Sequence, residues 1–278
     1  MKNKANVEVF KGFQSYGMKY PEYQVITPQS LKSYTIRTLT VEDEENLKGS
    51  LLSPSKVPYH LANVLWNCLV KKPDEIKTFE DFISKTTMKD RDALLFGLYQ
   101  ATYKNIQKYT VTCNKCGFAN QVKIDTDKWF SAKTWLERGD NFENVLSYRP
   151  SVDLKVFDGV SCVLRSPTMK DEITISEDTQ FSSEQVSNMQ MKLSMIDKFV
   201  IKASEQCPNG DTVEDRDNIL TAYNSLTASD KKLIDEAYVK EFGDYEIKVS
   251  GIVKCTKCKD QRPVEIDVSQ QFFRSLYE

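Results

Sequence analysis

The apolar residues of this chain follow two spacings, which predict helices and strands mixed along its length. Apolar side chains three or four residues apart mark one helix over residues 61–69 and another over 186–203. Two more helices are expected at residues 92–103 and 230–242. Strands are expected at residues 34–38, 107–112, 121–125, 154–157, 161–165, 246–254 and 263–268, with a hairpin turn at Asp158-Gly159. The pattern predicts an α+β fold.

Four Thr-x-x-Asp sequences are expected to start helices. They begin at Thr40, Thr87, Thr168 and Thr227. At a helix N-terminus, a threonine hydroxyl can accept a hydrogen bond from the backbone N–H of the third helical residue, while the aspartate lies at the positive end of the helix dipole. The acidic run at residues 42–45 is explained by such a start and by solvation.

A second pattern relates the two halves of the sequence. Residues 111–116 (VTCNKC) resemble 253–258 (VKCTKC), and the same offset of 142 (255 − 113 = 142) aligns 122–125 with 264–267 and Phe130 with Phe272. Upstream, residues 36–44 resemble 164–172 at an offset of 128 (164 − 36 = 128). We therefore expect an internal duplication into two similar halves, with a first repeat at residues 34–150 and a second at 151–278. An N-terminal arm at residues 1–33 is expected to dock through its aromatic side chains.

Seven cysteines occur, and four of them form two Cys-x-x-Cys pairs, Cys113 with Cys116 and Cys255 with Cys258. In a chain of this length, such pairs are typical of metal binding in a reducing compartment rather than of a disulfide framework. A Cys-x-x-Cys turn between two strands presents two thiolates, and a structural zinc ion takes four ligands in a tetrahedron. Equivalent hairpins of two related halves can meet on a pseudo-twofold axis. We therefore expect one structural zinc ion per chain, held by all four residues and joining the halves.

Other interpretations of the cysteines stay open at this point. Each pair could bind its own ion, the pairs could be redox-active, or the thiols could lie together without a metal. Neither pair opens a helix after a strand, where a redox-active thiolate is stabilised. Catalytic zinc sites usually include histidine or carboxylate ligands, and the chain has one histidine, His60.

The sequence lacks the motifs of common catalytic sites. It contains no G-x-x-x-x-G-K-S/T loop, no G-x-S-x-G and no H-E-x-x-H. His60 is expected at the start of the helix over residues 61–69, as a surface or partly packed side chain. We therefore expect a protein that is not an enzyme.

Charge and hydropathy narrow the choice of partners. The 38 basic and 40 acidic residues give a net charge of −2, which creates no overall attraction to nucleic acid or to an anionic membrane. No apolar run approaches the ~20 residues of a membrane span, and no signal-like stretch follows the start, so a soluble intracellular protein is expected. Basic residues surround the cysteine pairs: Lys104, Lys108, Lys115, Lys123, Lys254, Lys257, Lys259 and Arg262. They keep nucleic-acid binding as an alternative, although acidic residues lie among them and no aromatic platform accompanies them.

Three blocks carry a family resemblance: residues 34–45 (YTIRTLTVEDEE), 87–99 (TMKDRDALLFGLY) and 109–117 (YTVTCNKCG). Cys255 to Cys258 and Phe272-Phe273 follow in the same order. The chain resembles the zinc-knuckle baseplate hub and hub-assembly proteins of contractile-tailed bacteriophages of the T-even type. Lys259 stands where a glycine often follows such a cysteine pair.

The resemblance implies a structural or assembly protein of a phage tail baseplate hub. Its partners would be other baseplate and tail proteins, or copies of itself, and its place would be the virion after assembly in the host cytoplasm. The alternative is a zinc-ribbon nucleic-acid-binding or transcription accessory protein, based on the lysines. A third possibility is an assembly chaperone that leaves the hub, for which Met189, Met191 and Met195, in one expected helix, would supply an adaptable surface unless they pack in the core.

Overall fold

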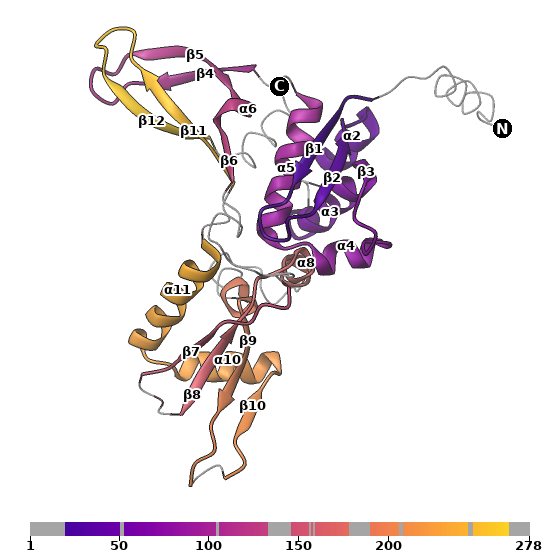
Figure 1. Cartoon of the computed structure of the whole chain (residues 1–278). Helices are drawn as coiled ribbons and strands as arrows, with labels where there is room; N and C mark the ends of the chain where they lie inside the picture. Colours follow the sequence, from indigo (N-terminus) through magenta and orange to yellow (C-terminus); the bar gives the residue numbers. More distant parts are fainter. Residues whose placement is uncertain are drawn as a thin grey trace, which may run out of the picture.

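The computed structural model has two α+β lobes and a separate β module (Figure 1). It describes residues 20–50, 53–103, 106–132, 146–155, 157, 159–177, 190–205, 208–243 and 247–266. We call residues 20–103 the first lobe and residues 146–243 the second lobe. Residues 106–132 and 247–266 together form the cysteine module, so this module draws on both halves of the chain.

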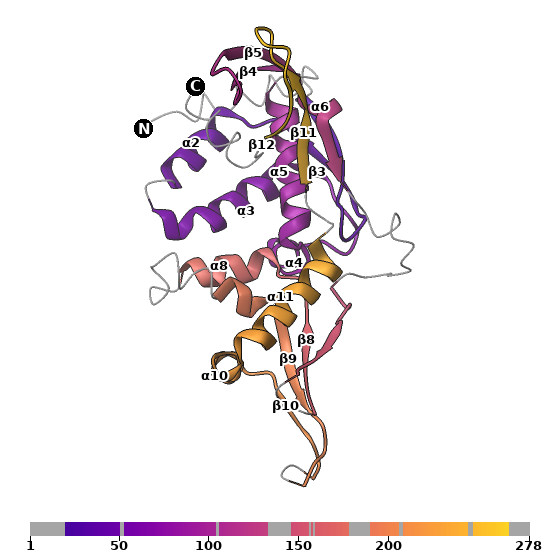
Figure 2. The same cartoon turned by 90° about the vertical axis from the view of Figure 1, so that its left-hand side faces the viewer.

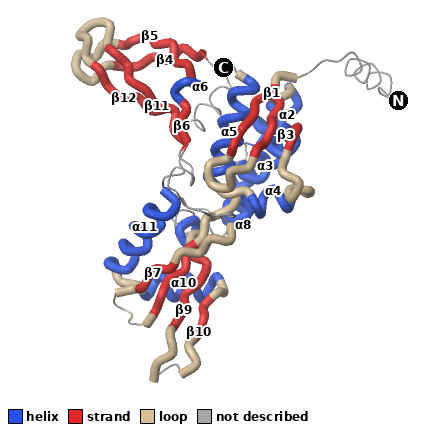
Figure 3. Tube along the Cα trace, in the orientation of Figure 1, coloured by secondary structure: helices blue, strands red, loops and turns tan. Residues whose placement is uncertain are grey.

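The first lobe is a three-stranded antiparallel sheet with helices on one face (Figures 2 and 3). The sheet has the order β1 (Glu22–Ile26), β2 (Ser33–Arg37), β3 (Leu69–Lys71). The helices are α2 (Val41–Ser50), η1 (Pro54–Lys56), α3 (Val57–Cys68), α4 (Phe79–Lys85) and α5 (Met88–Thr102). Helix α5 is buried from Ala93 to Ala101, where it packs against β1 and β2 of the sheet and against α3.

A glycine sets how closely α5 approaches the sheet. A Cβ atom at Gly97 would lie 2.2 Å from a Val25 methyl carbon on β1, which is far below any van der Waals distance. Any larger residue at this position would therefore push α5 away from β1, and the packing of the most buried helix in the first lobe would be lost.

The second lobe is built in the same way. Its sheet has the order β10 (Asp211–Val213), β9 (Ile196–Ile201), β8 (Val160–Leu164), β7 (Ser151–Asp153), all antiparallel. The helices are α8 (Met169–Glu177), α10 (Arg216–Ser225) and α11 (Ala228–Phe242). Cys162, Phe199 and Phe242 are among the buried side chains of its core.

Helix α8 leaves the second lobe to complete the core of the first. Its Met169 and Ile173 are buried among first-lobe side chains, and the helix contacts α3 and α4. The backbone also joins the lobes here, because the Met88 N–H donates to Pro167 O and the Met169 N–H donates to Thr86 O, both at 3.0 Å. The two lobes therefore share one interface at the starts of α5 and α8.

The cysteine module consists of two hairpins and a strand that crosses between them. The first hairpin is β4 (Ile106–Thr112) with β5 (Ala119–Asp125), and the second is β11 (Ile247–Lys254) with β12 (Gln261–Ile266). After β5, the short helix α6 (Thr126–Trp129) leads to β6 (Phe130–Ala132), which pairs with β11. The first half of the chain thus adds a strand to the second hairpin.

Most of the expected elements are confirmed, including helices α3, α5 and α11 and both hairpins of the cysteine module. The helix expected over residues 186–203 is wrong where the structure describes it after residue 195, because β9 occupies Ile196–Ile201. The pairing of β8 with β9 skips Asp197, and such a bulge puts Ile196 and Phe199, three residues apart, on one buried face. This spacing imitates a helix.

One expected strand differs in position. The strand expected at residues 154–157 lies earlier, at Ser151–Asp153, because the chain turns after it and the Leu154 N–H donates to Val160 O. Gly159 has a φ of 79°, as the expected turn requires, while Asp158 lies outside the described residues. The expected boundary between arm and first repeat, at residues 33 and 34, falls inside the β1–β2 hairpin, whose Val25 is buried in the core.

The Thr-x-x-Asp sequences that begin at Thr40, Thr87, Thr168 and Thr227 all lie at helix starts. The hydroxyls of Thr40, Thr87 and Thr227 each accept from the backbone N–H of the aspartate three residues on, at 3.2 Å. The N–H and the hydroxyl of Thr168 donate to Asp171, and those of Thr40 donate to Asp43 in the same way. The expectation of helix starts is therefore confirmed.

The aspartates of these sequences also tie each helix to a neighbouring loop or strand. Asp90 and Asp230 are almost fully buried. Asp90 accepts from the backbone N–H groups of Gln29 and Ser30 in the β1–β2 loop, and Asp230 accepts from the Lys155 N–H in the β7–β8 loop at 2.9 Å. Each of these buried carboxylates therefore holds a hairpin loop against a helix N-terminus.

The other two aspartates each hold an arginine from the sheet. Arg37 at the end of β2 donates to Asp43 at 2.7 Å, and Arg165 just after β8 donates to Asp171 at 2.7 and 2.8 Å. The Arg165 guanidinium and the Thr168 donors keep the pKa of the Asp171 carboxyl below its usual range, although burial acts to raise it. The same Arg and Asp pair thus links strand to helix in both lobes.

We predict that Asp90→Ala and Asp230→Ala each lower the free energy of unfolding by about 3 kcal/mol, because the substitution leaves buried backbone N–H groups without an acceptor. Urea unfolding followed by circular dichroism measures this change. Glu236→Ala, on the exposed face of α11, is the control and should stay within ~0.5 kcal/mol of the parent. A loss as small as the control's for both aspartates would contradict this role.

Candidate metal centre

Each Cys-x-x-Cys sequence lies in the turn of a hairpin, and the two turns have the same backbone hydrogen bonds. In the first turn, the Cys113 N–H donates to Phe118 O and the Gly117 N–H donates to Cys113 O, both at 2.9 Å. In the second turn, the Cys255 N–H donates to Asp260 O at 2.8 Å and the Lys259 N–H donates to Cys255 O at 3.0 Å. Every residue of the second set lies 142 positions after its counterpart. The turns therefore present their sulfur atoms in the same way.

The residue after each pair adopts the left-handed backbone conformation. Gly117 has a φ of 68° and Lys259 a φ of 63°. Lysine therefore takes the conformation for which glycine is the ordinary choice, at a cost of about 1–2 kcal/mol. The Lys259 ammonium donates to Thr256 O at 2.9 Å, which compensates part of that cost.

The fold brings all four cysteines together. Cys113 Sγ lies 3.6 Å from Cys258 Sγ, and Cys116 Sγ lies 3.7 Å from Cys255 Sγ, so each short distance joins the two turns. All four sulfur atoms lie within 4.8 Å of one another. Cys113 and Cys255 are buried, and Cys116 and Cys258 are half-buried.

These distances fit a single metal ion with four thiolate ligands. A zinc ion holds thiolates at ~2.3 Å, and a tetrahedron of that radius separates neighbouring sulfur atoms by about 3.8 Å. A disulfide would require about 2.05 Å, so the four residues are present as thiols. Four thiols at this separation could hold a metal ion.

Hydrogen bonds favour the thiolate form of one of the four cysteines, Cys255. Hydrogen bonds from the N–H groups of Cys258 and Lys257, with the Asn120 amide, hold the pKa of Cys255 well below that of a free thiol. At Cys258, a backbone hydrogen bond from Asp260 acts to lower the pKa, but burial and the surrounding sulfur atoms outweigh it and raise the value. The two thiols of the second turn therefore differ, because the pKa of Cys255 is lowered and the pKa of Cys258 is raised.

Two reciprocal contacts lock the turns together outside the sulfur cluster. Asn120 is buried, and its side-chain oxygen accepts from the Thr256 N–H at 2.8 Å and from the Thr256 hydroxyl at 3.0 Å. The Arg262 guanidinium donates to the Asn114 side chain at 2.6 Å. Positions 114 and 256 are equivalent at the offset of 142, as are 120 and 262. Each turn therefore contacts the other through the same two equivalent positions, as two copies related by a twofold axis would.

Sequence reasoning missed these contacts because the equivalent positions carry different amino acids. The repeat was recognised from identical residues, whereas the contacts pair Asn120 with Thr256 and Arg262 with Asn114. A search for complementary polar residues at equivalent positions would have found them. Asn120 also donates to Cys255 Sγ at 3.6 Å, which places it directly against the sulfur cluster.

The other sequence candidates lie partly in the first lobe and partly in the cysteine turns. His60 lies in the first turn of α3, where its ring contacts the edge of Tyr59, so it is half-buried as expected. Lys115 and Arg262 face the opposite turn, since Lys115 lies 4.0 Å from Asp260. Lys104 lies outside the described residues. Part of the basic charge near the cysteines thus serves contacts within the module.

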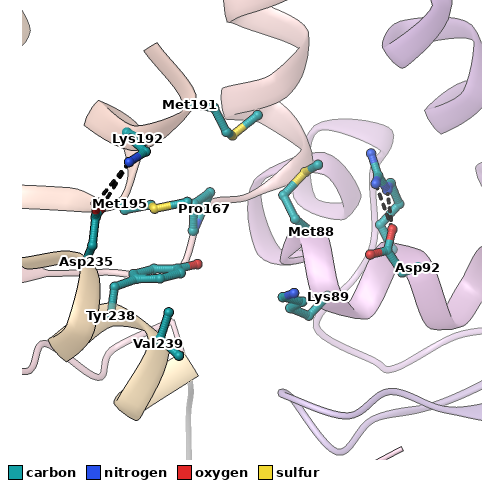
Figure 4. Close-up of a pocket in the computed structure, with 11 residues that line it drawn as sticks. Met88, Lys89, Asp92, Pro167, Met191, Lys192, Met195, Asp235, Tyr238 and Val239 are labelled. Atoms are coloured by element: carbon teal, nitrogen blue, oxygen red, sulfur yellow. Dashed lines mark hydrogen bonds and ion pairs between the residues drawn. The ribbon is translucent and has the colours of Figure 1, made fainter. Parts of the chain in front are cut away.

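A groove of about 470 Å³ lies between the N-terminal end of α5 and one side of α11 (Figure 4). Met88, Met191 and Met195 line it, so two of the three methionines expected in one helix face a surface groove, and Met189 lies outside the described residues. The charged groups Lys192 and Asp235 pair with each other there at 3.0 Å. The groove offers flexible apolar side chains and internally paired charges.

We predict that Lys259→Gly raises the free energy of unfolding by about 1 kcal/mol, because glycine takes the left-handed conformation without strain. The reverse change, Gly117→Lys, is the matched control. A Cβ atom at Gly117 has no neighbour within 4 Å, so this variant tests the backbone alone and should lose a similar amount. Urea unfolding of the purified variants measures both, and stability changes of equal sign would refute the strain.

One of three comparisons with known proteins finds a match. Within the part of the chain described by the structure, no helix has the length and apolar character needed to span a membrane. Searches of curated proteins and of solved structures returned no match. The model of one family, described as T4 bacteriophage base plate protein, matches residues 20–274, which cover both lobes and the cysteine module. The chain therefore belongs to the family of T4 bacteriophage base plate proteins.

Proposed function

We propose that this protein is a structural or assembly subunit of the phage baseplate hub, which acts through protein–protein contacts and carries one structural zinc ion. The family match over residues 20–274 supports a structural protein of the phage tail baseplate. Membership of a structural family also favours a protein without catalytic activity. The assignment to the hub rests on the resemblance of the motif blocks, and zinc rests on the chemistry of the site.

The donor set supports zinc over other metals. Four thiolates are soft ligands in a tetrahedron, an arrangement that suits zinc or iron–sulfur chemistry and does not suit magnesium or calcium. Cys113, Cys116, Cys255 and Cys258 leave no position for a substrate or water, which is the mark of a structural site. A bound ion would join two hairpins that lie 142 residues apart in sequence (255 − 113 = 142). When bound, the metal would supply the charge that lets all four thiols ionise.

We also propose that the two halves arose by duplication. In each lobe a hairpin leads into a helix that starts with Thr-x-x-Asp and is held by an arginine, and a third strand then joins the sheet. In each, a buried aspartate at a later helix start binds the hairpin loop, and a cysteine hairpin follows. The order of these features supports a first unit that includes β1 and a second unit that begins near β7.

The nucleic-acid alternative has less support. Lys115 and Arg262 face partners inside the cysteine module, and the net charge of −2 provides no attraction at a distance. Binding through the remaining lysines would weaken steeply with salt. Filter binding of DNA and RNA at two salt concentrations separates this alternative from a protein-binding subunit.

We expect purified protein to contain one zinc ion per chain by elemental analysis. Cys113→Ser or Cys255→Ser should lower the zinc content to near zero and lower the melting temperature, because either change leaves an incomplete tetrahedron. Cys162→Ala, in the buried core of the second lobe, is the control and should retain the metal. If both serine variants kept their zinc and their melting temperature, a shared site would be excluded.

We expect mass spectrometry of isolated tails and tail intermediates to detect this protein. A structural subunit should be present in finished particles at constant stoichiometry, whereas an assembly chaperone should occur only in intermediates. Non-structural phage enzymes from the same lysate provide the background control. A protein absent from every intermediate and every particle would refute the baseplate function.

A further inference from the structure

The side chain of Asn120 contacts both cysteine turns at once. It lies on β5, two residues after Phe118, and 2% of its surface is exposed. Its amide nitrogen donates to the carbonyl oxygens of Phe118 at 3.1 Å and Val111 at 3.2 Å, both in the first hairpin. Its oxygen accepts from the Thr256 N–H in the second turn, and its nitrogen also donates to Cys255 Sγ. One buried side chain thus bridges the two hairpins.

The surrounding groups fix which way the Asn120 amide points. The two backbone carbonyl groups can only accept, so they require the amide nitrogen, whereas the Thr256 N–H can only donate and requires the amide oxygen. A reversed amide would place acceptor against acceptor and donor against donor at a buried position, where unpaired polar groups are costly. The sulfur atom of Cys255 therefore has an N–H donor directed at it.

Asn120 also fixes the backbone beside one candidate ligand in each turn. Thr256 follows Cys255 directly and lies between the two cysteines of the second turn. In the first turn, Phe118 O accepts from the Cys113 N–H as well as from Asn120. These bonds involve protein groups alone. The alignment of the two turns therefore depends on this side chain as well as on any ion between the sulfur atoms.

The equivalent position of the second hairpin is used differently. Arg262 lies 142 positions after Asn120 (262 − 120 = 142), and it donates to Asn114, an exposed residue. The hydrogen bonds found at the sulfur atoms of the four cysteines in the described part of the chain include Asn120 and do not include Arg262. The turns are equivalent in their backbone, but support for a sulfur atom comes from this position in one turn alone.

We propose that Asn120 is the positioning residue of the metal centre. Its side chain aligns the second turn with the first, and its N–H supports Cys255 as a ligand. The affinity of the site for metal therefore depends on position 120 far more than on position 262. Groups that orient metal ligands from outside the coordination shell typically change metal affinity about 10- to 100-fold when they are mutated. This inference rests on the proposed structural metal and says which residue prepares its site.

Competition with a chromophoric chelator measures the zinc affinity of the purified full chain and its variants. Asn120→Ala should weaken zinc binding by about 10- to 100-fold, whereas Arg262→Ala, which removes the equivalent contact, should change it less than about threefold. Circular dichroism of the zinc-saturated proteins shows whether each variant is folded. Equal affinities of the parent and Asn120→Ala would overturn the proposal, and so would equal losses in the two variants.

Cobalt(II) provides a readout that a purely structural role would not move. The near-ultraviolet charge-transfer band of a cobalt–thiolate site reports the electron density on sulfur, which a hydrogen bond to that sulfur alters. Loss of the N–H donor should therefore shift this band in Asn120→Ala and leave it in place in Arg262→Ala. An unchanged band in cobalt-loaded Asn120→Ala would overturn the support of Cys255 by this residue.

If Asn120→Ala does not fold, Asn120→Asp gives the same comparison. This variant has nearly the same shape and keeps an acceptor for Thr256, but an ionised carboxylate cannot donate to Cys255. Asn114→Asp is the matched control, because it adds the same charge to the first turn and keeps its partner Arg262. Asn120→Asp should bind zinc on the order of tenfold more weakly than Asn114→Asp. Equal affinities of these two variants would overturn the proposal.

Failure of the structural metal itself would give a different result. A parent chain that binds neither zinc nor cobalt would refute the metal and, with it, the role of Asn120. One metal ion per chain in the parent, with unchanged affinity and spectrum in Asn120→Ala, would refute the role of Asn120 alone.

Discussion

The contact between the two cysteine turns is the constraint on which the rest of the architecture depends. It joins residues that lie about half a chain apart, and it does so reciprocally, with Cys113 near Cys258 and Cys116 near Cys255. The hydrogen bonds of Asn120 with Thr256 and of Arg262 with Asn114 repeat that exchange in polar form. Bringing such distant segments together costs loop-closure entropy, which a metal ion bound by the four thiols would offset. The two halves of the chain are consequently joined at two places, the interface at the starts of α5 and α8 and the cysteine module.

A repeated motif also links neighbouring elements inside each lobe. A threonine and an aspartate three residues apart start a helix, and the aspartate then binds a second element, either a hairpin loop or an arginine on a strand. A buried carboxylate is stable only when its oxygens are hydrogen-bonded, so each of these sites couples the position of a helix to the position of its neighbour. In this fold, the aspartate at the helix start therefore also makes a tertiary contact.

Sequence reasoning correctly predicted the elements in which regular secondary structure alone sets the spacing of the apolar side chains. Helices α3, α5 and α11 and the cysteine hairpins follow from simple periodicity and capping, and the four cysteines follow from their spacing. It failed where two effects overlap. The bulge at Asp197 gave β9 a helical spacing, so apolar periodicity predicted a helix there. Contacts between different residue types, such as Asn120 with Thr256, could not be found by looking for identical residues at equivalent positions.

The placement of α8 has a consequence for how the chain folds during synthesis. Met169 and Ile173 belong to the hydrophobic core of the first lobe, although they follow the first cysteine turn by more than fifty residues (169 − 116 = 53). A nascent chain that has reached the end of α5 therefore still lacks part of the core it needs, and domain-by-domain folding on the ribosome is not available to it. The first lobe closes only after the second has begun to emerge, and the sulfur cluster closes last, when β11 and β12 are complete.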